Sequence, residues 1–237
     1  MYSIVIPAYN EERRVGPTIH SYISFLNKNK INYEIIVICD GCTDRTVDVV
    51  KKFSHNEKIR LFVLPQRLGK GGGVHYGFSK CSGDTIGFVD ADNAVRPEEF
   101  KKLIDNIEGV DCVIASRRVE NAIMLIPPKS RLWVFSMRLL SQIFNKVVVN
   151  LIFRLNIKDT QCGAKFMKRY VYENIRNELK INGFEFDVEL LWRIKEHGYK
   201  IKEVGVIWRH DLESKSRIMN SFNMLISLLK RKYWSSL

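Results

Sequence analysis

Residues 34–53 read EIIVICDGCTDRTVDVVKKF and contain the strand, turn and helix from which the fold class can be inferred. Glu34–Cys39 is a β-branched, mostly apolar run that predicts a strand, while residues 43–53 have the apolar spacing of a helix. Asp44 or Thr43 is the expected N-cap of that helix. The same succession of strand, polar turn and helix recurs through the first 115 residues. Strands are expected at 3–6, 34–39, 60–64, 85–89 and 111–115, and helices at 11–28, 43–53, 70–81 and 97–106.

This alternation predicts an α/β fold, in which a mostly parallel, Rossmann-like sheet is flanked by helices. Ligands of such sheets bind at the carboxyl ends of the strands. After residue 120 the pattern changes, and we expect helices at 168–178 and 185–197 and a strand at 202–208. Five cysteines, an odd number, favour reduced thiols over a disulfide framework.

The positive charge of the chain is concentrated in its second half. The formal net charge is +12; residues 1–120 carry 17 Lys and Arg against 16 Asp and Glu, whereas residues 121–237 carry 21 against 10. Such an imbalance favours an anionic partner: nucleic acid, an anionic membrane surface or a phosphorylated substrate. No stretch reaches about 18 apolar residues without a charge, so no membrane-spanning helix is expected.

Two basic, apolar segments suggest contact with a bilayer surface. Residues 132–153 are apolar but carry spaced basic side chains, and residues 221–234 end in Lys-Arg-Lys-Tyr-Trp. Amphipathic helices of this kind lie in the membrane interface, where basic groups meet the lipid headgroups. Peripheral attachment to a membrane is therefore expected. The alternative is that both segments are core helices or dimer helices.

The ends of the first three predicted strands carry polar side chains suited to a nucleotide. The first strand runs into Pro7-Ala8-Tyr9-Asn10-Glu11, whose ring and polar groups suit a base and a ribose, although a helix start has similar chemistry. The second ends in Asp40, which can reach a ribose hydroxyl. The third leads to Gly69-Lys70-Gly71-Gly72-Gly73, where glycines would admit a phosphate and Lys70 supplies charge.

The fourth predicted strand ends in Asp90-Ala91-Asp92. Two carboxylates at the lip of a parallel sheet are hard oxygen ligands beside the expected phosphate site. They suit Mg²⁺ or Mn²⁺, which share their coordination with substrate phosphates and water. Burying both negative charges without a cation would be costly. Asp92 and Asp90 are therefore the expected metal ligands.

The order of seven motifs resembles that of the inverting family-2 glycosyltransferases of GT-A fold. The motifs are PAYNEE (7–12), CDG (39–41), LGKGGG (68–73), DAD (90–92), SR (116–117), DTQCGAK (159–165) and FEFDVELL (184–191). The resemblance covers residues 1 to about 217. It is greatest to the dolichyl-phosphate β-glucosyltransferases and next to the dolichyl-phosphate mannosyltransferases.

The resemblance implies roles for individual residues. Nucleotide-sugar contacts fall on Pro7, Ala8, Tyr9, Glu11, Asp40, Lys70, Asp90, Ala91, Asp92 and Gln161. Arg117 and Arg131 match positions that bind the acceptor phosphate, and Lys215 is a weaker match to such a position. Catalytic roles fall on Asp187, Asp159 and Arg117. Residues 1–120 would then form the nucleotide-sugar-binding half and residues 121–237 the acceptor-binding half.

The implied reaction is the transfer of a hexose, glucose from UDP-glucose, with inversion onto a polyprenyl or dolichyl phosphate at the cytoplasmic side of a membrane. The alternatives are a GDP-mannose-dependent enzyme of the same kind and a family-2 transferase with a hydroxyl acceptor. A nucleic-acid-binding protein would leave Asp90 and Asp92 without a purpose. A nucleotidyltransferase would also use an acidic pair and a Gly-Lys loop, but would release pyrophosphate.

Overall fold

The computed structural model describes residues 1–127, 152–209 and 228. Its strands are β1 (Tyr2–Ala8), β2 (Tyr33–Asp40), β3 (Ile59–Leu64), β4 (Thr85–Val89), β5 (Cys112–Ser116), β6 (Ile123–Leu125), β7 (Ala164–Lys168), β8 (Ile201–Gly205) and β9 (Ile207–Arg209). Its helices are α1 (Val15–Lys28), α2 (Thr46–Lys51), α3 (Lys70–Phe78), α4 (Pro97–Asp105), α6 (Arg169–Ile175) and α7 (Phe186–Glu196). The expected α/β fold, with a mostly parallel sheet flanked by helices, is confirmed.

Seven strands form the central sheet in the order β3-β2-β1-β4-β7-β5-β8. All neighbouring strands are parallel except at β7, which is antiparallel to both β4 and β5. A separate parallel pair joins β6 to β9. The carboxyl ends of β1, β2 and β4 therefore meet at one edge of the sheet, which is the edge that binds ligands in parallel α/β folds.

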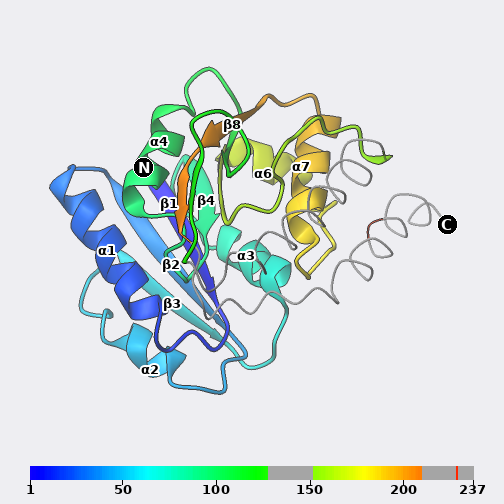
Figure 1. Cartoon of the computed structure of the whole chain (residues 1–237). Helices are drawn as coiled ribbons and strands as arrows, with labels where there is room; N and C mark the ends of the chain where they lie inside the picture. Colours follow the sequence, from blue (N-terminus) through cyan, green and yellow to red (C-terminus); the bar gives the residue numbers. More distant parts are fainter. Residues whose placement is uncertain (128–151, 210–227, 229–237) are drawn as a thin grey trace.

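Helices cover both faces of the sheet (Figure 1). Side chains on β1 alternate, so that Ile4 and Ile6 pack in one buried cluster with residues of α1, α2 and α4, while Val5 packs in another with residues of α3, α6 and α7. Because both faces are buried, the strands are almost continuously apolar. This explains why their sequence shows short β-branched runs rather than strict alternation.

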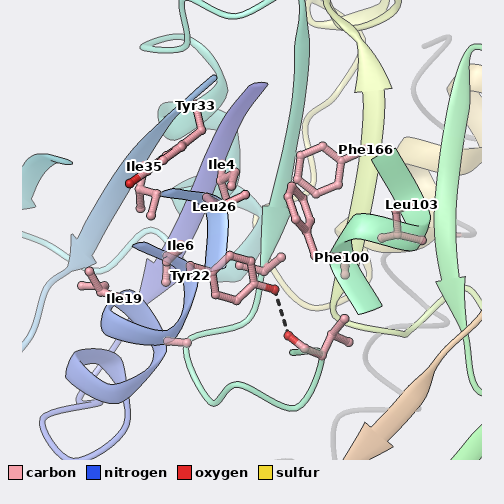
Figure 2. Close-up of a cluster of buried hydrophobic side chains, with 14 of the residues drawn as sticks. Ile4, Ile6, Ile19, Tyr22, Leu26, Tyr33, Ile35, Phe100, Leu103 and Phe166 are labelled. Carbon is pink, nitrogen blue, oxygen red and sulfur yellow. Dashed lines mark hydrogen bonds between the residues drawn. The ribbon is translucent and has the colours of Figure 1, made fainter. Parts of the chain in front are cut away.

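Figure 2 shows the first of these two clusters, in which Tyr22 of α1 lies beside Phe100 of α4. Phe100 is fully buried and packs edge-on against Phe166 of β7, with ring centroids 4.5 Å apart. Burying one such ring contributes roughly 1.5–3 kcal/mol. The Tyr22 hydroxyl donates to the Val95 carbonyl at 2.8 Å, so this core also fixes the loop that follows β4.

Several sequence-based boundaries differ from the structure. β7 was not expected, and the strand expected at 202–208 is divided at Val206 into β8 and β9, which belong to different sheets. α2 begins at Thr46 rather than at residue 43, although Asp44 still accepts the Thr46 N–H at 2.9 Å. The two expected interfacial segments lie outside the described residues, apart from residues 152, 153 and 228. All five cysteines are free.

Candidate active site

An acidic turn follows β4 at the carboxyl edge of the sheet. Asn93 has a positive φ of 56°, and Asp92 Oδ1 accepts the Ala94 N–H at 3.0 Å, which closes the turn. α1 holds the turn from one side, because Thr18 Oγ1 donates to the Ala91 carbonyl at 2.8 Å. From the other side, the Asp90 N–H donates at 2.9 Å to the carbonyl of Gly163, the residue just before β7. The two carboxylates are thus placed by elements on both sides of β4.

Asp92 is mostly buried, and the negative charge of Asp90 acts on its ionisation. Burial and the Asp90 charge raise the pKa of Asp92 to about 6, against an ordinary value near 4. A divalent cation would relieve this repulsion, and carboxylate oxygens are ligands that Mg²⁺ and Mn²⁺ accept. The described residues contain no group of three or more His, Cys, Asp or Glu side chains able to hold a metal. A cation here would therefore complete its shell with water or substrate phosphate.

The loop that joins β3 to α3 is held by Asp40, the last residue of β2, and ends at Lys70, the first residue of α3. The two oxygens of Asp40 accept the backbone N–H groups of Leu68 and Gly69, at 2.7 and 2.8 Å. Lys70 follows directly, and its Nζ lies 3.0 Å from Asp90 Oδ1. Asp40 therefore fixes the loop that brings the Lys70 ammonium group to the acidic turn.

The glycines after Lys70, which were expected to let the backbone approach a phosphate, have backbone N–H groups that bond within the protein. The N–H groups of Gly71 and Gly72 donate to the Asn182 carbonyl, at 2.8 and 3.3 Å. A Cβ on Gly71 would lie 2.5 Å from the Ile181 carbonyl oxygen and from Phe186 Cβ. These glycines instead allow α3 to approach the segment before α7, and the approach joins regions more than 100 residues apart in sequence.

The segment after β1 carries the expected base-binding residues. The Arg67 guanidinium lies 3.7 Å from the centre of the Tyr9 ring and covers one of its faces. Glu11 accepts two bonds from Arg14, at 2.6 and 2.7 Å, and so stands in an ion pair. Pro7 is half-buried and Ala8 is buried at the end of β1, beside the end of β2.

Arg117, at the end of β5, has a partly exposed side chain and forms an ion pair with the buried Asp159. Arg117 Nε and Nη2 donate to the two Asp159 oxygens at 2.7 and 2.8 Å, and the Arg117 N–H donates to Oδ2 at 2.9 Å. Burial would raise the pKa of Asp159, but the Arg117 guanidinium lowers it to about 2. The two side-chain bonds use two of the five guanidinium N–H donors. The Trp208 ring lies 5.4 Å from the guanidinium carbon.

The acidic turn and this ion pair occupy one continuous region. Cys162 and Gly163 connect them, because Gly163 bonds Asp90 while Asp159 begins the same turn. Burial lowers the pKa of Arg117, but the Asp159 charge, the Asp159 hydrogen bond and a smaller contribution from Asp90 raise it above its ordinary value. Gln161 Nε2, in the same turn, is buried and has no hydrogen-bond partner among the described residues.

Asp187, an expected catalytic residue, lies in the first turn of α7 and is 1% exposed. Its Oδ1 lies 2.5 Å from Lys165 Nζ and its Oδ2 lies 3.4 Å from Lys70 Nζ. Lys70 therefore links Asp187 to the acidic turn, because its ammonium group lies near both Asp187 and Asp90. Arg131 and Lys215, the other two expected phosphate contacts, lie outside the described residues.

Two residues at this edge escaped the sequence interpretation. Lys165 is fully buried within β7. Glu203 of β8 accepts the backbone N–H groups of Lys158 and Asp159, at 2.8 and 2.9 Å, and thereby holds the turn that carries Asp159. Lys165 ends the DTQCGAK motif but received no role, because an isolated Lys or Glu in a short strand is normally solvent-exposed.

Comparisons with known proteins agree on one family. The model of the family described as Glycosyl transferase family 2 matches residues 3–176. A dolichyl-phosphate beta-glucosyltransferase of Dictyostelium discoideum is 34% identical over 87% of this chain and 65% of its own length. Glycosyltransferase AglD of Haloferax volcanii is 28% identical over 98% of this chain, which spans only 37% of that protein.

Solved structures show the same fold. Glucosyl-3-phosphoglycerate synthase of Mycobacterium tuberculosis in complex with uridine diphosphate superimposes with a TM-score of 0.68 at 19% identity, covering 98% of this chain and 79% of that one. The same enzyme with Mn²⁺, uridine diphosphate and its product gives a TM-score of 0.66 at 20% identity, covering 98% and 78%. The expected GT-A fold is confirmed.

Proposed function

This chain belongs to glycosyl transferase family 2, and we propose that it transfers glucose from UDP-glucose, with inversion, onto a polyprenyl or dolichyl phosphate. The observation that carries the proposal is that the Asp90–Asp92 turn and the Arg117–Asp159 pair lie at one edge of the sheet, joined through Gly163. The Asp90–Asp92 turn suits a metal ion and a diphosphate, and the Arg117–Asp159 pair suits an anionic acceptor. The names of the relatives support glucose and dolichyl phosphate.

The donor would lie along the ends of β1, β2 and β4. Tyr9 and Glu11 would contact the nucleoside, while Lys70 would face the diphosphate and Gln161 the sugar. Asp92, with Asp90, would hold Mn²⁺ or Mg²⁺, and the Mn²⁺-containing complexes of the related fold support this choice of metal. When bound, the cation would stabilise the negative charge on the departing diphosphate.

The acceptor needs no strong general base. A phosphate monoester has a second pKa near 6, so it is mostly dianionic at neutral pH and can attack the anomeric carbon directly. The work of the protein is to bring two anions together in the correct geometry. Arg117, oriented by Asp159, would bind the acceptor phosphate; Arg131 and Lys215 are proposed to assist. Asp187, tied to two lysines, suits a positioning role better than proton abstraction.

We also propose that the enzyme acts as a peripheral protein at the cytoplasmic side of a membrane, where a polyprenyl phosphate would present its headgroup. The excess of positive charge in residues 121–237 supports this proposal. In the described part of the chain, no helix is both long enough and apolar enough to cross a bilayer.

A donor panel tests the proposed reaction. Labelled UDP-glucose, GDP-mannose and UDP-N-acetylglucosamine are each offered with polyprenyl phosphate and Mn²⁺, and label extracted into organic solvent is measured. We expect transfer from UDP-glucose. Transfer from GDP-mannose alone would show that the donor is GDP-mannose rather than UDP-glucose. Release of pyrophosphate would show that the enzyme is a nucleotidyltransferase.

The variant D92N tests the metal site in the same assay. We expect it to lower kcat by at least about 100-fold, the scale of losing one preorganised electrostatic contact in an active site. D105N is the matched control, since Asp105 is an exposed carboxylate at the end of α4, paired only with Lys101 among the described ion pairs. Equal activity of the two variants would contradict the assignment.

A further inference from the structure

Lys165 is a fully buried lysine in the middle of a strand. It lies on β7 between Ala164 and Phe166, which face the α1 and α4 side of the sheet, so its own side chain points to the α3 and α7 side. Its Nζ lies 5.3 Å from the centre of the Phe88 ring. A buried ammonium group in apolar surroundings is costly unless it is paired, so the partners of Lys165 indicate its role.

Lys165 begins a row of alternating charges that leads to the acidic turn. Its Nζ donates to Asp187 Oδ1 at 2.5 Å and to the Cys162 carbonyl at 2.9 Å. Asp187 Oδ2 lies 3.4 Å from Lys70 Nζ, and Lys70 Nζ lies 3.0 Å from Asp90 Oδ1. Side-chain exposure rises along the row from 0% at Lys165 to 1%, 12% and 35% at Asp90. The row therefore runs from the core to the proposed donor site.

The distances within the row show how Lys70 is shared. Asp187 makes its shorter contact with Lys165, at 2.5 Å, and its longer contact with Lys70, at 3.4 Å. Lys70 in turn lies closer to Asp90 than to Asp187. Without the Lys165 charge, the buried Asp187 would attract Lys70 more strongly, because a buried carboxylate needs a cationic partner. Lys70 would then move inward, away from Asp90.

We propose that Lys165 is a positioning residue, which neutralises Asp187 and so leaves the Lys70 ammonium group at Asp90, ready for the donor diphosphate. The inference rests on the proposed function, because it assigns to Lys70 a diphosphate ligand. Lys165 itself touches no substrate. Its effect on donor binding passes through Asp187 and Lys70.

The test measures the Kd of UDP with Mn²⁺ by calorimetry, at a temperature at which circular dichroism shows each variant to be folded. K165Q keeps an amide donor near Asp187 and Cys162 but removes the charge. We expect K165Q and K70M each to raise the Kd about tenfold, which corresponds to about 1.4 kcal/mol. If Lys165 acts through Lys70, the double variant K165Q/K70M is no weaker than K70M alone.

K168M is the matched control, because Lys168 lies on the same strand and none of the described ion pairs includes it; its Kd should equal that of the wild type. An unchanged Kd in K165Q, with only a lower Tm, would show a structural ion pair and overturn the proposal. A Kd about 100-fold higher in K165Q/K70M would mean independent effects and would also overturn it.

Should K165Q fail to fold, K165Q/D187N carries the test, because it removes both buried charges. We then expect a Kd clearly below that of K70M, since Lys70 keeps its charge and no carboxylate at position 187 draws it inward. A Kd raised about tenfold in that variant would contradict the route through Asp187. A wild-type chain that binds no UDP would overturn the proposed donor as well, whereas wild-type binding with an unchanged K165Q refutes this inference alone.

Discussion

Asp159 illustrates how one residue serves both the fold and the site. Its carboxylate is 1% exposed, accepts three bonds from Arg117, and belongs to a turn that Glu203 holds by two further bonds. The Arg117 guanidinium cannot adopt another rotamer without leaving a buried charge unpaired. The orientation proposed for gripping an acceptor phosphate is therefore built into the folded chain.

The variant D159N should weaken the fold in a pH-dependent way. Because the folded pKa of Asp159 is lowered to about 2, its stabilisation is fully present above the unfolded value near 4 and is lost as the pH falls through 2. Two pKa units correspond to about 2.7 kcal/mol. We expect the free energy of unfolding of D159N to be about 3 kcal/mol below the wild type at pH 7, and the difference to shrink below pH 4.

Urea denaturation at pH 7 and pH 3 measures this difference. D105N is again the control, because the exposed Lys101–Asp105 pair should contribute less than about 1 kcal/mol. A D159N variant as stable as the wild type at pH 7 would show that the ion pair contributes nothing net.

The sequence alone indicated most of the candidate site residues, but it did not indicate which residues they contact. Asp90, Asp92 and Lys70 stood out because polar residues follow apolar strands. The contact of Arg117 with Asp159 joins residues 42 positions apart, and nothing local indicates it. Likewise, Asp40 seemed suited to a ribose, whereas both its oxygens hold backbone N–H groups of the loop before α3.

At the scale of elements, β7 is the strand on which the site depends and the one that the sequence concealed. It is short, and Lys165, its second residue, interrupts the apolar run that would mark a strand buried on both faces. The Lys165 charge is neutralised inside the protein by Asp187, which lies 22 positions later in the sequence. β1 to β5 were readable because most of their buried residues are apolar.

Gly163, just before β7, is expected to be intolerant of a side chain. A Cβ at this position would lie 1.8 Å from Asp90 Oδ2 and 2.4 Å from Asp90 Cγ. G163A should therefore displace the Asp90 carboxylate, weaken the binding of UDP with Mn²⁺, and lower the free energy of unfolding by about 1–3 kcal/mol, the usual cost of overpacking.

G73A is the matched comparison within α3. A Cβ on Gly73 would meet its nearest neighbours at 3.8 Å, which is ordinary contact. Alanine in place of glycine inside a helix should raise the free energy of unfolding by roughly 0.5–1 kcal/mol. Thermal denaturation and UDP titration distinguish the two variants, and a G163A variant that binds UDP as the wild type does would refute the steric account.

At the scale of the whole molecule, the sheet was predictable and the packing between distant segments was not. Strand–helix alternation fixed a mostly parallel sheet, yet the close approach of Gly71 to residues 181–186 depends on shape complementarity between α3 and the segment before α7. The division at residue 120 is a prediction about function. The central sheet itself includes β7 and β8 from beyond that residue.

The charge asymmetry predicts binding to anionic membranes. Residues 121–237 carry 21 basic and 10 acidic side chains, so we expect the chain to sediment with phosphatidylserine-containing vesicles at low salt. Binding should fall as the Debye length shrinks from about 10 Å at 0.1 M salt to about 3 Å at 1 M. Phosphatidylcholine vesicles are the control. If the chain bound neither vesicle type, the proposal of peripheral attachment would be wrong.

The most direct test compares two acceptors that differ only in the phosphate. The purified chain is given labelled UDP-glucose and Mn²⁺ with either polyprenyl phosphate or the corresponding polyprenol, and label in the organic phase is counted. We predict transfer to polyprenyl phosphate and none to the alcohol, because Arg117 is proposed to grip an anion and no strong base is proposed for a hydroxyl. Equal transfer to both acceptors, or none to the phosphate, would contradict the account.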